Sequence, residues 1–532
     1  MGISQVLPAN WPWLAVGLIT IYTSYLTFKF IKHRRFYNGL PTPPHSLILG
    51  NLAIMGEGMK NYPADIHPQP LFTQLGIDYK FDGIYYLDLY PFSESFIFIL
   101  DPDLALQVQS QPHLFPRHQF AINFLGGIVG KKSIFSTMGK EWQQQRSWFA
   151  PAFSMGHLLT LVPGMIEEVL VFKEKLTKFA VTGDTFVMND EAMKLAIDLI
   201  GRNVGDIKLR SQVGYSPIQD SFSSAIEWTA GVTDPWWKKL LSPVMMRWYT
   251  GRLDRELRRV IEKRYKERAG EDGVDKSILD LALRGYNKEK GKLGGEKMVR
   301  ADLDGEFMQL ALDNAKTFFA GGHDTTASLI TYMFYYLSIN PSILSRVRAE
   351  HDQVFGADLE STIKTLTANP ALVNHLPFTL AVLKETLRLH PVGFTVREAV
   401  PGATITYKDR TYPMEGHMIA VLASSMHRDP ALWPSLDSMP LDEYHPDRFL
   451  DSETHSSAAW QPFEKGPRNC IGQQLALLEV KVIAVLMVRW FDFEAQFRDH
   501  GLKIEGWGGR AYQELKLSAK PKDGIPMVAK LR

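Results

Sequence analysis

Cys470 is the only cysteine among 532 residues, and it lies in the segment 463–472 (FEKGPRNCIG). One thiol cannot form an intramolecular disulfide, a CxxC pair or a multi-thiolate zinc site. If it does chemistry, it acts as a nucleophile or as the single thiolate ligand of a metal. A lone cysteine more often packs as a small apolar residue, but Gly466 and Gly472 allow a tight turn and the close approach of a flat ligand. Backbone N–H groups at the start of a following helix would stabilise a thiolate, so the local sequence favours ligation.

A second candidate group lies in the segment 319–326 (FAGGHDTT), inside an apolar stretch from about 307 to 337. Two glycines within a helix each cost about 1 kcal/mol relative to alanine. They therefore indicate that a ligand approaches the backbone closely or that the helix is locally distorted. Asp324 and Thr325 place a carboxylate next to a hydroxyl, a pair that can move protons. Taken alone, such a pair is more often a helix cap or a turn.

The cysteine segment resembles the haem-binding loop of the cytochrome P450 family, the haem-thiolate monooxygenases, at Phe463, Gly466, Arg468, Cys470 and Gly472. The resemblance implies haem b with Cys470 as the axial ligand, a thiolate that donates electron density and favours O–O cleavage. It also implies that Phe463 shields the sulfur and that Gly472 belongs to the cofactor-binding loop. Glu464 departs from the family pattern, which has a small or polar residue there.

The same resemblance assigns roles to other motifs that occur in family order. Asp324 and Thr325 match the acid–alcohol pair that manages protons at the oxygen site. The haem propionates would be held by Arg468, by Arg397 and by Trp142 and Arg146, which lie four residues apart on one helical face.

A structural role is implied for three further residues. Glu385 and Arg388 lie three apart on one helical face and can pair. In the family, this pair binds a later arginine, here Arg448, and braces the backbone that leads to Cys470. We expect these three residues to be structural and not catalytic.

The composition fits one large body. The chain is 45% hydrophobic and 11% aromatic, enough for a large core and an apolar pocket, and its net charge of +1 argues against nucleic acid as a partner. The length alone would suggest about three domains, but no linker rich in Pro, Gly or Ser divides the chain after residue 52. The resemblance to the cytochrome P450 family implies a mainly α fold with a small β region, a single cytochrome P450-type domain over 53–532.

The N-terminus predicts a membrane anchor. Residues 1–28 carry no charged side chain, and 11–28 are mostly apolar or aromatic, with a basic cluster at 29–35. This order is unlike a cleaved signal peptide and places the cluster on the cytosolic side. We expect a transmembrane helix with a basic flank over 1–35, with an interfacial helix as the alternative, and a stiff proline-rich linker over 36–52. The implied location is the endoplasmic reticulum membrane, single-pass, with a cytosolic catalytic domain.

The resulting hypothesis is a monooxygenase that inserts one oxygen atom from O2 into a large, mostly apolar substrate. The detail of the cysteine loop resembles fungal members that oxidise polyketide or terpenoid intermediates of secondary metabolism. The chain contains no reductase domain, so the resemblance implies electrons from a separate NADPH-cytochrome P450 reductase, with cytochrome b5 as a further donor. Alternatives are a fatty acid or alkane hydroxylase, an isomerase without a reductase and a haem-binding membrane sensor without turnover.

We also expect a substrate pocket and a surface that attracts the reductase. Segments 120–125, 317–319 and 392–396, including Phe394, should line the substrate pocket. Lys140 and Lys465, with Arg468, should lie near the thiolate side of the haem and attract an acidic reductase surface.

Overall fold

The computed structural model describes residues 11–229, 235–267, 277–289, 305–393, 395–433, 439–450, 457–497, 503–516 and 518–532. The α-helices of these ranges are α1 (Trp11–Phe36), α2 (Leu52–Met59), α3 (Gln69–Asp78), α4 (Pro102–Ser110), α5 (Gln119–Val129), α6 (Gly139–Phe149), α7 (Met155–Thr182), α8 (Met188–Gly205), α9 (Pro217–Glu227), α10 (Trp236–Glu267), α11 (Ile278–Glu289), α12 (Gly305–Ile339), α13 (Pro341–Phe355), α14 (Leu359–Ala368), α15 (Pro377–Leu389), α16 (Ala423–Met426) and α17 (Gln473–Met487). The strands are β1 (Ile84–Leu87), β2 (Phe96–Ile99), β3 (Phe186–Val187), β4 (Val396–Arg397), β5 (Thr404–Tyr407), β6 (Arg410–Pro413), β7 (Met418–Val421), β8 (Phe491–Ala495), β9 (Gln513–Leu515), β10 (Ala519–Pro521) and β11 (Pro526–Leu531).

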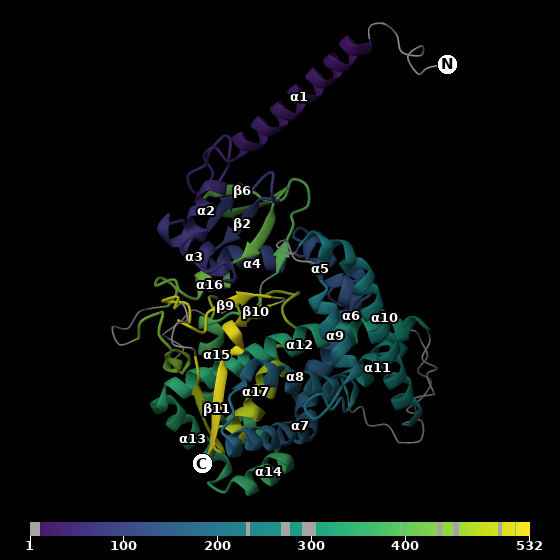
Figure 1. The fold of residues 1–532 in the computed structure, drawn as a ribbon, viewed down its shortest axis with the longest axis vertical. Helices are drawn as coiled ribbons and strands as arrows, with labels where there is room; N and C mark the ends of the chain where they lie inside the picture. Colours follow the sequence, from purple (N-terminus) through teal and green to yellow (C-terminus); the bar gives the residue numbers. More distant parts are fainter. Residues whose placement is uncertain are drawn as a thin grey trace.

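The predicted mainly α fold with a small β region is confirmed. The largest sheet has the order β1-β2-β7-β4, in which β2 and β7 are parallel and the other pairs are antiparallel. This sheet lies between α1 and the helical body (Figure 1). The segment 36–52 was expected to be a stiff extended linker. In the structure, residues 37–50 of this segment instead fold into turns against the sheet, where the Tyr86 N–H donates to the Pro41 carbonyl at 2.8 Å.

Helix α12 crosses the middle of the helical body (Figure 1), and most of its side chains from Phe307 to Leu337 are buried. A helix that is apolar on all sides is stable only when other elements cover it. Here α8, α15 and α17 pack against it. Helix α17 begins directly after Gly472 and is itself almost wholly buried. The core therefore fixes α12 and α17 relative to each other, with the cysteine loop at the start of α17.

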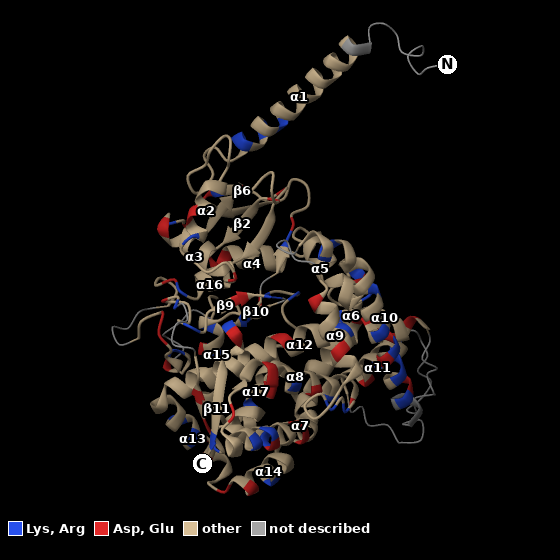
Figure 2. Ribbon diagram, in the orientation of Figure 1, with Lys and Arg blue, Asp and Glu red and all other residues tan. Residues whose placement is uncertain are grey.

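Helix α1 projects from the body, and its apolar length is uncharged up to the basic residues at the end near the sheet (Figure 2). The stretch Trp13–Phe36 is long and apolar enough to cross a membrane, and its apolar 18-residue window contains no buried residue. A second apolar helix of sufficient length, α7, is 44% buried and belongs to the core. The basic residues at 29–35 belong to the same helix, which continues through them to Phe36.

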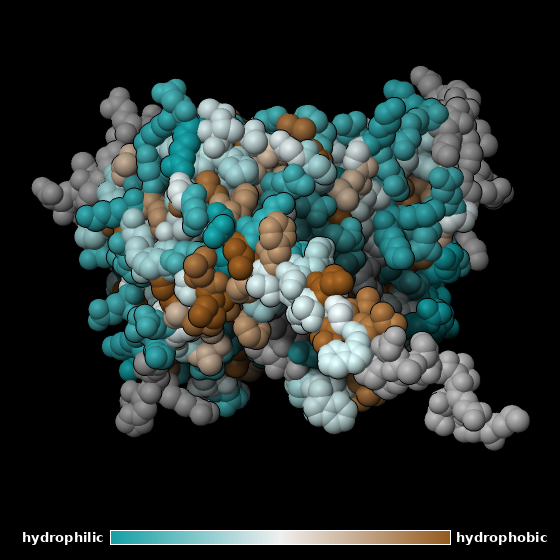
Figure 3. Space-filling model, turned by 90° about the horizontal axis from the view of Figure 1, so that it is seen from above, coloured by the Kyte–Doolittle hydropathy of each residue, from teal (hydrophilic) through white to brown (hydrophobic). Residues whose placement is uncertain are grey.

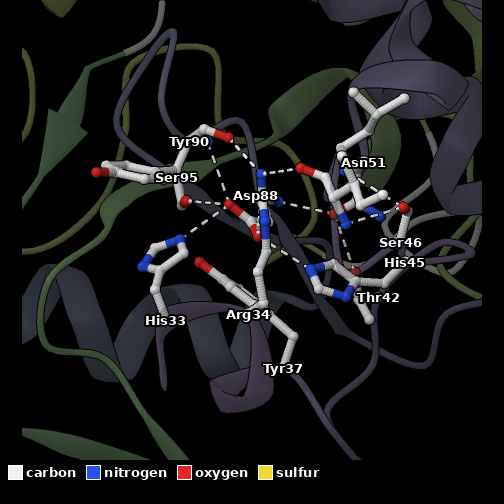
Figure 4. A network of polar contacts seen from close by, with 12 residues as sticks. His33, Arg34, Tyr37, Thr42, His45, Ser46, Asn51, Asp88, Tyr90 and Ser95 are labelled. Carbon is white, nitrogen blue, oxygen red and sulfur yellow. Dashed lines mark hydrogen bonds and ion pairs between the residues drawn. The ribbon is translucent and has the colours of Figure 1, made fainter. Parts of the chain in front are cut away.

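A polar network joins α1 to the sheet (Figure 4). Asp88, directly after β1, pairs with the guanidinium of Arg34 and accepts hydrogen bonds from His33 Nε2 at 3.0 Å and His45 Nε2 at 2.9 Å. The Ser95 hydroxyl donates to the same carboxylate at 3.2 Å. Burial by itself would raise the pKa of Asp88, but the hydrogen bonds from His33, His45 and Arg34 hold it well below its usual range. Helix α1 is thus fixed to the body through an ionised, buried carboxylate.

Candidate active site

The backbone of the cysteine loop is a tight turn. The Cys470 N–H donates to the Phe463 carbonyl at 2.9 Å, which closes the loop. Gly466 has φ = 73°, and a Cβ at this position would lie 2.4 Å from the carbonyl oxygen of Gln109. Only glycine fits there, because the conformation is left-handed and the neighbouring backbone leaves no room for a side chain. The tight turn expected from the sequence is therefore present, and α4 packs closely against its outer side.

The Cys470 sulfur is free and accessible, and it receives backbone hydrogen bonds from Gly472 and Gln473 at the start of α17. Burial raises the pKa of the thiol, while these N–H groups and the charge of Arg146 act in the opposite direction. Among the described residues, no group of three or more His, Cys, Asp or Glu side chains could hold a metal ion. A single thiolate from Cys470 therefore fits a metal ion whose other ligands belong to a cofactor, as in haem.

The sulfur faces an apolar cavity of about 210 Å³ between α12 and the cysteine loop. The cavity is lined by Arg117, Ile134, Phe135, Trp142, Arg146, Phe153, Ile200, Val204, Thr317, Phe318, Gly321, Gly322, Thr325, Thr326, Phe463, Arg468, Asn469, Cys470, Ile471, Gly472, Leu475, Ala476 and Glu479. Of the predicted site residues, Asp324 and Arg397 are not part of this lining. A flat, apolar ligand with a charged edge matches such a chamber.

One edge of the cavity carries positively charged side chains. Arg468 lies over the Trp142 ring at 4.4 Å and donates to the Thr137 carbonyl at 2.7 Å, but its Nη1 is buried and has no hydrogen-bond partner among the residues that the structure describes. Burial and the neighbouring guanidinium groups, Arg117 first, lower the pKa of Arg468 to about 9. A buried cation with an unused donor calls for an anionic partner. The carboxylates of haem propionates would supply one, so the residues present fit haem.

Two other predicted propionate ligands contact the protein itself. Arg146 donates to the Asn469 carbonyl at 3.0 Å and to its side-chain oxygen at 2.8 Å, so it ties α6 to the residue before the cysteine. Arg397 on β4 forms an ion pair with Glu464 at 2.9 Å. The structure thus brings both arginines to the cysteine loop, and only Arg146 reaches the cavity wall.

The two glycines of α12 differ in role. Gly321 faces the cavity, and a Cβ there would meet no atom within 4 Å. A Cβ on Gly322 would lie 2.3 Å from Ile200 on α8, so this glycine is required by close helix packing. The helix is continuous across both residues, and the Thr325 hydroxyl donates to the Gly321 carbonyl at 2.6 Å. The sequence predicted either the close approach of a ligand or a local distortion of the helix. The structure shows a continuous helix, with the Ile200 side chain of α8 close to Gly322.

Asp324 points away from the cavity. Its carboxylate is buried and forms an ion pair with Lys520 Nζ on β10 at 2.6 Å, and the Ser518 hydroxyl donates to its other oxygen. Lys520 is partly exposed and also contacts the sulfur of Met193 at 3.3 Å. Asp324 therefore belongs to the ion pair with β10, and its neighbour Thr325 belongs to the cavity wall, so that the two residues connect these environments.

The three residues expected to be structural lie together. Arg388 donates to both carboxylate oxygens of Glu385, at 2.7 and 2.9 Å, and Arg448 Nε lies 3.5 Å from the same carboxylate. All three are buried. Arg388 also donates to the His427 carbonyl, and the His427 ring accepts from the Gln461 N–H at 3.1 Å. This chain of contacts reaches the segment that precedes the cysteine loop.

The expected substrate-pocket segments are only partly placed at the cavity. Thr317 and Phe318 line it, whereas the stretch 120–125 on α5 and the described residues of 392–396 do not. Phe394 lies outside the described residues. Sequence reasoning missed Arg117, which lines the cavity and donates to the Phe135 carbonyl at 2.6 Å. No motif marks it, because an isolated β-bridge to Arg397 brings it to the site.

The family model for cytochrome P450 matches residues 64–520. The chain is a member of the cytochrome P450 family. Cytochrome P450 monooxygenase polC of Polytolypa hystricis is 30% identical over 530 residues, covering 96% of this chain and 93% of the relative. Cytochrome P450 monooxygenase acrF of Aspergillus aculeatus is 32% identical over 504 residues, covering 87% and 97%.

A crystal structure of the cytochrome P450DA heme domain has the same fold, with a TM-score of 0.71 and 22% identity over 93% of this chain and 98% of that one. The expected cofactor, haem with a thiolate ligand, and the expected class of enzyme, a monooxygenase, therefore agree with both the site and the family. The sensor without turnover is set aside, since the similar fungal relatives are monooxygenases.

Proposed function

We propose that this cytochrome P450 is a membrane-bound monooxygenase that oxidises a large, mostly apolar intermediate of fungal secondary metabolism, a polyketide or a terpenoid. The observation that carries this proposal is the apolar cavity that lies between the Cys470 sulfur and Gly321, Gly322 and Thr325 of α12. The similarity to fungal monooxygenases over nearly the whole chain supports the fungal setting. Fatty acids and alkanes are the alternative substrates.

Thiolate-bound haem iron supplies the activation of dioxygen. In this chain Cys470 would ligate the iron, and Arg468 and Trp142 would hold the acidic edge of the haem. Thr317 and Phe318 narrow the α12 side of the cavity and exclude water from it.

Protons would reach the site through Asp324 and Thr325. The Thr325 hydroxyl lies in the cavity wall, and Asp324 lies beside it in contact with the partly exposed Lys520. In this relay, the Thr325 hydroxyl would turn from the Gly321 carbonyl and release its own proton into the cavity, and a proton taken up at the Asp324 carboxylate would replace it.

The membrane would be that of the endoplasmic reticulum, with the catalytic domain in the cytosol. Hydrophobic side chains gather on the face seen from above, the side from which α1 projects (Figure 3). Near the base of α1, Ile48 and Phe92 are 76% and 83% exposed. The basic end of α1 favours the cytosolic side by the positive-inside rule.

Electrons would come from the NADPH-cytochrome P450 reductase of the same membrane, with cytochrome b5 as a further donor. Lys140 is exposed on α6, and Lys465 belongs to the cysteine loop. These cations would attract an acidic reductase surface. Arg468 is buried at the cavity edge, so it serves the haem and not the reductase.

The test is reconstitution of the full chain with reductase in lipid nanodiscs, with polyketides, terpenoids and fatty acids offered in parallel. The expected result is NADPH-dependent incorporation of one atom from ¹⁸O₂ into a polyketide or terpenoid. Preferential turnover of fatty acids would overturn the substrate class. Cys470→Ser is the control, because it removes the thiolate and should abolish the red-shifted Soret band of the reduced carbon monoxide complex.

A further inference from the structure

Glu464, where the loop departs from the family pattern, is bound to Arg397. One carboxylate oxygen lies 2.9 Å from Arg397 Nη2, and the other accepts the hydroxyl of Thr395. Only 4% of the Arg397 side chain is exposed. Its Nη1 donates to the Phe115 carbonyl at 3.4 Å. Both terminal nitrogens of the Arg397 guanidinium are therefore bound by other groups of the chain.

The position of Glu464 is set by the backbone of the cysteine loop. Its φ is 56°, a left-handed conformation that is uncommon for a residue with a Cβ. Its N–H donates to the Gln461 carbonyl at 3.2 Å, and the next residue back, Phe463, accepts from Cys470. The carboxylate is thus held by the same turn that presents the sulfur.

Glu464 counters a group of like charges. Arg117, Arg146, Arg397 and Arg468 gather around the loop, and their repulsion lowers the pKa of Arg468 further than burial does alone. In the described part of the chain, the Glu464 carboxylate acts against this repulsion at both Arg117 and Arg468. It forms its ion pair with Arg397 only, which leaves Arg468 with a free, buried donor.

We propose that Glu464 is a built-in counter-ion that occupies Arg397, so that Arg468 and Arg117, and not Arg397, bind the haem propionates. Its negative charge, fixed in the cysteine loop, also favours the ferric over the ferrous state of the iron. The inference rests on the haem site of the family and is independent of the proposed substrate. It assigns to Glu464 a positioning role for the cofactor.

The experiment compares Glu464→Gln, Arg397→Gln, Arg468→Gln and the Glu464→Gln/Arg397→Gln double variant as full-length holoproteins in nanodiscs. The readouts are the midpoint potential of the haem and the rate of haem transfer to an excess of apomyoglobin. Glu464→Gln should raise the midpoint potential, because removal of a negative charge favours reduction, and should slow haem transfer, because Arg397 becomes free for a propionate. The double variant should lose that slowing. Glu141→Gln, an equal change of charge at an exposed position of the cavity-lining helix α6, should change neither readout.

Arg468→Gln should speed haem transfer strongly, whereas Arg397→Gln should not. Equal acceleration by both would show that Arg397 already binds a propionate and would overturn the proposal. The comparison of Arg468→Gln with Arg397→Gln leaves Glu464 unchanged. It therefore shows which arginine binds a propionate even if the Glu464→Gln protein does not accumulate. An unchanged midpoint potential in a folded Glu464→Gln protein would remove the electrostatic role.

Discussion

The Arg34 guanidinium near the end of α1 and the Asp88 carboxylate after β1 form an ion pair in which neither side chain is exposed. The same guanidinium donates to the carbonyls of Ile48 at 3.0 Å and Tyr90 at 2.7 Å. A single arginine therefore joins helix α1, the segment that follows it and the sheet.

Asp88→Asn should destabilise the junction, because it leaves a buried arginine without its counter-charge. Removal of one partner of a buried ion pair costs about 3–5 kcal/mol. The measurement is the apparent melting temperature of the full chain in nanodiscs. Asp82→Asn breaks the exposed pair with Lys408 and should have a small effect, since such pairs contribute about 0–1 kcal/mol. Equal effects of the two variants would contradict a structural role for the Asp88 network.

Stability should depend on pH through Glu479. This carboxyl lines the cavity, and burial raises its pKa to about 8, although Asn203 donates a hydrogen bond at 2.7 Å that acts in the opposite direction. The folded protein then keeps a proton that the unfolded chain, with a pKa of about 4.3, releases. Its contribution to stability is therefore lost progressively as pH rises from about 4.3 to about 8.

Glu479→Gln should abolish this part of the pH dependence and melt at a higher temperature than the unsubstituted protein at alkaline pH. The glutamine keeps an acceptor for Asn203 but cannot ionise. Melting curves measured between acidic and alkaline pH test this expectation. Glu360→Gln, at a side chain that is 75% exposed, provides the matched control. Parallel curves for Glu479→Gln and the unsubstituted protein would show that Glu479 does not carry the effect.

Proton delivery should depend on Lys520, because this residue holds the Asp324 carboxylate at 2.6 Å. Lys520→Met should increase the NADPH consumed per molecule of product and enlarge the solvent isotope effect, with an intact carbon monoxide spectrum. Lys520→Arg should restore much of the coupling, since it keeps the charge. Lys530→Met, at an exposed lysine that pairs with Glu494, should be neutral. Full coupling in Lys520→Met would separate this ion pair from proton transfer.

Electron transfer should depend on Lys465 in the cysteine loop. Lys465→Glu should slow reduction of the haem by reductase, most strongly at low ionic strength, because steered association is screened by salt. Stopped-flow reduction across a salt series measures this. Lys408→Glu reverses a charge at the turn between β5 and β6 and should leave the rate unchanged. The same salt dependence in all three proteins would place the reductase elsewhere.

The sequence by itself determined the parts of the site that are local. The cysteine loop, its glycines and the following helix are contiguous, and their turn geometry follows from residue type, so Cys470 and its hydrogen-bonding surroundings could be predicted. The same holds for the Glu385–Arg388 pair, which one turn of helix brings together. The mainly α fold was expected from the resemblance of these motifs to the family, and the long N-terminal helix from its apolar sequence.

Only the tertiary structure decided which distant groups meet. Asp324 pairs with Lys520, and Arg397 with Glu464, because strands far along the chain return to α12 and to the cysteine loop. Arg117 reaches the cavity through an isolated bridge to Arg397, which no spacing in the sequence encodes. A charged side chain selects its partner by proximity after folding, and proximity is a property of the packed core. For this reason the cysteine loop and the arginines near it could be expected from the sequence, while the ion pairs Arg397–Glu464 and Asp324–Lys520 could not.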